Sequence, residues 1–232
     1  MNPYEHHTRA AVDRILGTLR TGDADTLAKP VAACEGWTVA DLVGHLGGVH
    51  RWAAVAIREQ RGDHDTEPAP SEAAELTEWF AAGAHDLLEA LAGDPHRPTW
   101  SFSREPGHDR LGFWQRRQAH ENSMHAWDVA TAVGAPASYD ESLAADGIGE
   151  VLEVFVPRMR ARGLLAELPA SVALIGPDFY WLLGDAPDPI AEAQGSCVDI
   201  LLTLWHRADG SALTWGGHAE AGRAVLRQRL VP

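Results

Sequence analysis

Apolar residues recur at helical spacing along the first two thirds of the chain, as at Ile15, Leu16 and Leu19. A period of three to four residues predicts amphipathic helices. The expected helices cover residues 4–21, 38–60, 71–92 and 109–133. Thr38, followed three residues later by Asp41, is typical of a capping box and marks the start of the second helix. Four helices in succession with these connections predict a bundle.

The pattern changes after residue 138. One more helix is expected at 141–162, and short β-rich runs follow at 171–175, 179–183 and 190–193. A helix at 196–207, a strand at 212–215 and a final helix at 218–230 complete the prediction. Strands mixed with helices are typical of an α+β domain. We therefore predict two domains, a helical bundle over residues 1–138 and a small α+β domain over residues 139–232.

Composition narrows the class of protein. The net charge is -14, which disfavours a nucleic-acid partner because phosphate backbones are repelled. No apolar run approaches the roughly 18 residues of a membrane span, and the start of the chain has no apolar core of a secretory signal. Cys34 and Cys197 are far apart, which excludes a disulfide framework and favours a reducing compartment. We expect a cytoplasmic protein in which both cysteines are small buried hydrophobes.

His45 interrupts the apolar stripe of the second helix, three residues after Leu42 and four before Val49. This spacing predicts that its ring points into the bundle. A buried imidazole needs hydrogen-bond partners or a metal ion, so a core histidine and a metal ligand both remain open. Two nearby histidines, His50 and His120, are expected on other faces and rank lower.

Glu121 and His125 are four residues apart on the fourth helix and share one face, which Arg117 and Asp128 extend. Two imidazoles and one carboxylate on facing helices suit zinc or another first-row divalent ion. Three protein ligands leave a position open, as catalytic metals require. Asp128 either orients a ligand imidazole or pairs with an arginine. In the metal-free alternative, Glu121 and His125 pair with each other.

Three segments carry a resemblance to a known family. They are GWTVADLVGHL at 36–46, RQAHENSMHAWD at 117–128 and SCVDILLTLWHR at 196–207. They resemble motifs of the mycothiol-dependent maleylpyruvate isomerase family. This resemblance implies an α+β protein with an N-terminal DinB-like four-helix bundle and a small mixed α/β (SCP2-like) domain. It also implies that His45, Glu121 and His125 bind a divalent metal, usually zinc.

The resemblance further implies a function. Mycothiol adds to a cis double bond as a thiolate, the C–C bond rotates, and the thiol leaves. Arg207 matches a catalytic arginine of the family, which often has Gly where this chain has His206; otherwise Arg207 is a cation at a helix end. The expected partners are mycothiol and a small, anionic electrophile, in an isomerase or a thiol-S-transferase. The alternative is a non-catalytic, metal-binding DinB-like protein with a stress or sequestering role. The oligomeric state is open.

Overall fold

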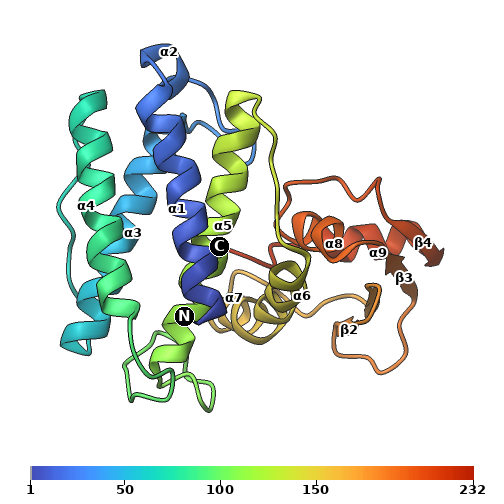
Figure 1. Ribbon diagram of the computed structural model, residues 1–232. Coiled ribbons are helices and arrows are strands. Elements are labelled where there is room, and N and C mark those ends of the chain that lie inside the picture. Colours follow the sequence, from blue (N-terminus) through green and yellow to red (C-terminus); the bar gives the residue numbers. More distant parts are fainter. Residues whose placement is uncertain (1) are drawn as a thin grey trace. The chain divides into compact units, whose positions relative to one another are not determined.

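The computed structural model describes residues 2–232. The chain divides into two compact units, Met1–Ser138 and Tyr139–Pro232. The first unit is helical, and the second combines helices with a four-stranded mixed sheet (Figure 1). The predicted α+β class is therefore confirmed.

The first unit contains the predicted bundle. Its long helices are α1 (Pro3–Thr21), α3 (Val39–Glu59), α4 (Ala73–Leu91) and α5 (Leu111–Val133). A single turn, α2 (Ala24–Leu27), was not predicted; Asp23 caps it by accepting a hydrogen bond from the Thr26 backbone. The most extensive contacts join α3 to α4 and α1 to α5, while α1 also meets α4 and α3 meets α5. Each long helix therefore packs on two neighbours (Figure 1).

Local sequence fixes the helices that carry the site. The capping box at the start of α3 is present: Thr38 Oγ1 accepts from the Asp41 amide at 3.2 Å, and Asp41 Oδ2 accepts from the Thr38 amide at 2.9 Å. α5 ends at Gly134, whose φ of 73° favours glycine. Gly47 lets α3 approach α4, because a Cβ there would lie 2.3 Å from the Trp79 ring. Gly47 therefore allows the close packing of α3 on α4 at this point.

The second unit begins with α6 (Glu141–Glu150), a π-helical turn η1 (Val151–Phe155) and α7 (Val156–Ala161). The expected single helix at 141–162 is thus interrupted by one wider turn, which ends two residues before Pro157; that residue has no N–H for the helical ladder. The strands are β1 (Val172–Ile175), β2 (Tyr180–Leu183), β3 (Ala191–Gln194) and β4 (Thr214–Gly217). Their order is β2-β1-β3-β4, with β1 and β3 parallel and the outer pairs antiparallel.

The last two helices are shorter than predicted. α8 (Cys197–Leu204) stops three residues before the expected end, and α9 (Ala219–Leu226) four before. His206 has a φ of 57°, in the left-handed region, so α8 cannot continue through it.

Cys197 is buried, and this burial, together with Glu141, raises the pKa of its thiol to about 11. Cys34 is only half-buried, packed beside the bundle core. Within residues 2–232, no helix is long and apolar enough to cross a membrane.

Candidate metal centre

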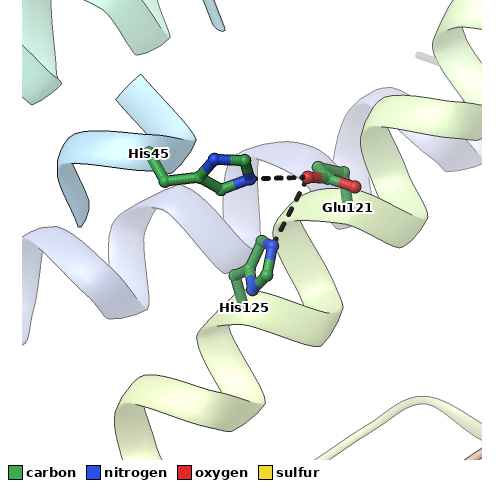
Figure 2. A group of neighbouring side chains, drawn as sticks. All are labelled: His45, Glu121 and His125. Atoms are coloured by element: carbon green, nitrogen blue, oxygen red, sulfur yellow. Dashed lines mark ion pairs between the residues drawn. The ribbon is translucent and has the colours of Figure 1, made fainter. Parts of the chain in front are cut away.

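His45 on α3 and Glu121 and His125 on α5 bring their polar atoms together (Figure 2). Glu121 Oε1 lies 3.8 Å from His45 Nε2 and 3.4 Å from His125 Nε2. One donor atom from each residue lies within 4.8 Å of the others. The two rings meet edge to face, with centroids 5.6 Å apart.

This donor set fits a divalent ion. Ligand atoms about 2.1 Å from one ion can be at most about 4.2 Å apart, and the two carboxylate–imidazole distances are shorter than that. The two imidazole nitrogens lie within 4.8 Å of each other. Imidazole nitrogen and carboxylate oxygen are donors that zinc and other first-row ions accept. The same contacts also form an ion pair between Glu121 and His125 without any ion, so the geometry is compatible with both arrangements.

Arg117 holds the other oxygen of Glu121. Its Nη2 donates to Glu121 Oε2 at 2.6 Å, and its side chain is almost fully buried. Burial alone would raise the pKa of Glu121, but hydrogen bonds from His125 and His45 and the charge of Arg117 hold it well below its usual value. Glu121 is therefore ionised at neutral pH and presents Oε1 to the two histidines.

Asp128 orients the ring of His125. Its Oδ2 lies 3.1 Å from His125 Nδ1, and the carboxylate is buried. Burial opposes a charged imidazole, but Asp128 and Glu121 outweigh it and raise the pKa of His125 to about 9. A carboxylate on Nδ1 leaves Nε2 to face an ion, which is the usual arrangement behind metal-bound histidines.

The prediction that His45 points into the bundle is wrong. Its side chain is 41% exposed, whereas those of Glu121 and His125 are 17% and 12% exposed. The buried face of α3 is centred on His50, which has no exposed surface. At 100° per residue, His45 lies roughly 140° around the helix from that centre. It reaches Glu121 from the edge of the bundle rather than from its core.

His50 instead joins a second polar cluster, which the sequence did not reveal. Its Nε2 lies 2.7 Å from Asn122 Oδ1, and the Asn122 amide donates to the Gln118 carbonyl at 2.8 Å. Burial lowers the pKa of His50 to about 4, against the weaker opposing effect of Asn122. His120 is also buried, with its ring edge-on to Tyr4.

Arg207 lies in the second unit, in the loop after α8 rather than on the helix. It lines a pocket of about 520 Å³ together with Arg223, Arg227 and Trp215. Its Nη1 donates to the Trp205 carbonyl at 2.8 Å. His206, directly before it, adopts the left-handed conformation that favours glycine, and its ring contacts the Leu226 carbonyl at 3.1 Å.

A helical bundle with a His–Glu–His cluster and a small mixed-sheet unit together define an α+β protein with a candidate metal centre. Residues 8–130 match the mycothiol maleylpyruvate isomerase N-terminal domain, and the chain belongs to this family. Two uncharacterized proteins of Mycobacterium tuberculosis, MT0763 (strain CDC 1551 / Oshkosh) and Rv0738 (strain ATCC 25618 / H37Rv), are 30% identical over 167 residues, or 70% of this chain and 85% of each relative.

Solved structures share the fold. The crystal structure of a mycothiol-dependent maleylpyruvate isomerase superposes with a TM-score of 0.62 at 15% identity, covering 92% of this chain and 91% of that one. A histidine-to-alanine mutant of a mycothiol-dependent maleylpyruvate isomerase gives a TM-score of 0.63 at 14% identity with the same coverage. The predicted family and architecture are confirmed.

Proposed function

We propose that this chain is a metal-dependent enzyme that uses mycothiol on a small, electrophilic, anionic substrate. The reaction is cis–trans isomerisation, as in maleylpyruvate isomerase, or thiol transfer. The observation that carries the proposal is the convergence of His45, Glu121 and His125 from two helices on one point. Family membership supports mycothiol as the thiol. We place this chemistry in the cytoplasm, where thiols stay reduced.

The residues of the cluster have distinct roles in this proposal. A divalent ion bound there would act as a Lewis acid that lowers the pKa of a thiol. Glu121 presents Oε1 because Arg117 holds Oε2. Since Arg117 also balances the charge of Glu121, the cluster repels an incoming thiolate less than a bare carboxylate would. Asp128 keeps the His125 ring in position.

The isomerisation needs no oxidant or reductant. The thiolate sulfur bonds to one alkene carbon, and the alkene electrons move into the conjugated carbonyl. The former double bond then rotates, the C–S bond breaks, and the trans alkene and the thiolate are released. In the transfer reaction the C–S bond remains and the adjacent carbon takes a proton. Arg207 is assigned to the substrate carboxylate, because a guanidinium pairs with it in two parallel hydrogen bonds.

Metal binding tests the first half of the proposal. The chain offers a matched control in His85 and Glu89 on α4, also four residues apart and 3.4 Å apart, but exposed. We expect wild type and Glu89→Gln to bind one zinc per chain. Glu121→Gln, which loses a charged ligand, should bind zinc at least ~100-fold more weakly. This loss is larger than the usual loss when a residue that hydrogen-bonds to a ligand is removed. Chelator competition measures this. Dialysed protein that takes up no metal, and whose melting temperature zinc leaves unchanged, would support the metal-free ion pair instead.

Thiol-dependent turnover tests the second half. Metal-loaded wild type is incubated with maleylpyruvate and other cis-α,β-unsaturated acids, with and without mycothiol, and products are followed by absorbance and mass spectrometry. We expect conversion only with mycothiol, lost in Glu121→Gln and retained in Glu89→Gln. Arg207→Met is expected to raise KM for the acid. Tight metal binding with no acid consumed would contradict the enzyme and favour the sequestering alternative.

A further inference from the structure

Trp37 borders the accessible side of the candidate metal centre. Its ring centroid lies 5.1 Å from that of His45, with the planes inclined by 58°. His45 is the most exposed of the three candidate ligands. Trp37 itself is 36% exposed, more than any other tryptophan of residues 2–232. A molecule that reaches the cluster from the His45 side therefore passes this indole.

The backbone around Trp37 is fixed. The Trp37 carbonyl accepts from the Val31 amide at 2.9 Å, and the Trp37 amide donates to the Cys34 carbonyl at 2.9 Å. The capping box of α3 follows directly at Thr38. An aromatic ring on a held backbone loses little conformational freedom when it is covered, so contact with a ligand costs little entropy.

The Trp37 indole N–H makes no hydrogen bond to the residues that the structure describes. By contrast, Trp52 donates to the Gly62 carbonyl and Trp114 to the Trp100 carbonyl. An exposed ring with a free N–H offers an apolar face and one polar donor side by side. This combination suits a ligand that has both C–H surface and hydroxyl groups.

We propose that Trp37 is the platform for the ring-bearing part of the thiol cosubstrate, an inference that rests on the proposed function. A thiol with its sulfur at the cluster must place the rest of its molecule toward solvent, on the side of His45 and Trp37. Mycothiol carries its thiol on an N-acetylcysteine group, which is joined to two hydroxylated rings. The indole face covers one such ring, and the indole N–H donates to a hydroxyl.

The test compares two thiols on the metal-loaded protein. Mycothiol has the rings, whereas N-acetylcysteine has the thiol alone. For Trp37→Ala we expect the dissociation constant of mycothiol, measured by calorimetry, to rise about tenfold, which is the upper range for one aromatic contact. The dissociation constant of N-acetylcysteine and the zinc affinity should stay unchanged. Trp37→Phe keeps a ring face but loses the N–H, so its effect on mycothiol should be smaller.

Several outcomes would overturn the inference. If Trp37→Ala weakens both thiols equally, or weakens zinc, Trp37 acts by positioning His45 and touches no ring. If wild type uses mycothiol and Trp37→Ala binds it equally well, only the platform is wrong. If wild type binds zinc but no thiol, the proposed function fails first, and this inference with it.

Discussion

Two histidines on neighbouring helices of the bundle have opposite chemistry. His50 on α3 meets the neutral amide of Asn122, and burial lowers its pKa to about 4. His125 on α5 meets the carboxylates of Glu121 and Asp128, which raise its pKa to about 9. Burial is common to both, so it does not distinguish a structural histidine from a candidate ligand. Ionised neighbours make the difference, because only they stabilise positive charge at the ring.

The largest effect that separates the two regions is expected for His50→Ala. Removing the ring leaves a cavity in the core and Asn122 without its partner, so the free energy of unfolding should fall by about 4 kcal/mol. The zinc affinity should hardly change, because His50 lies outside the cluster. Urea denaturation and chelator competition measure the two quantities. A variant that keeps its stability but loses zinc would place His50 in the metal site.

The second-largest effect is expected from His50 in the pH dependence of the free energy of unfolding. Its pKa is about 6.5 in an unfolded chain and about 4 in the folded one, so only the unfolded state takes up a proton between these values. The free energy of unfolding of metal-free protein should therefore fall by about 3 kcal/mol as pH drops from 6.5 to 4. His125 acts in the opposite sense: its contribution is complete below pH 6.5 and is lost as pH rises through 9.

Denaturation of His50→Leu isolates the contribution of His50, because the Asp and Glu side chains that also titrate at low pH are the same in wild type and variant. The fall between pH 6.5 and 4 should be shallower in the variant by the amount due to His50. Equal curves for wild type and variant would mean that His50 is protonated in the folded state.

The sequence predicts much of the bundle and less of the site. The long helices lie within two residues of their expected ends, because apolar periodicity and the Thr38–Asp41 capping box are local signals. The face of α3 was misjudged because apolar residues occur almost all around it. Leu42 and Val49 suggested a stripe beside His45, whereas the buried face follows His50. Which face is buried depends on where α4 and α5 pack, and periodicity does not encode that.

Residue spacing predicts the arrangement on α5 better than the buried face of α3. Glu121 and His125 share a face by spacing alone, and Arg117 and Asp128 extend it, as the structure shows. The pairing of each group with its partner depends on side-chain directions within one helix, which spacing fixes. The role of the cluster, like that of Arg207, stays a prediction until metal and substrate are measured.

Asp128→Asn removes one of the ionised partners that distinguish His125 from His50. The variant keeps the shape of the side chain but removes the charge behind the imidazole. We expect the zinc affinity at pH 8 to fall about 10- to 100-fold, the usual effect of losing such a partner. Asn122→Ala, which removes the partner of His50 instead, should leave the zinc affinity unchanged. Equal losses in both variants would show that the two clusters act as one network.

The smallest effect expected is the pH dependence of zinc affinity itself. Because the pKa of His125 is about 9 in the metal-free protein, its ring must lose a proton before Nε2 can bind an ion. The apparent affinity should therefore rise about tenfold per pH unit between pH 7 and 8, with about one proton released by His125 for each zinc bound. Calorimetry in two buffers of different ionisation enthalpy counts the protons. His50 is already neutral in this range and releases no proton. An affinity that stays unchanged across these pH values would mean that His125 is also neutral before the metal binds.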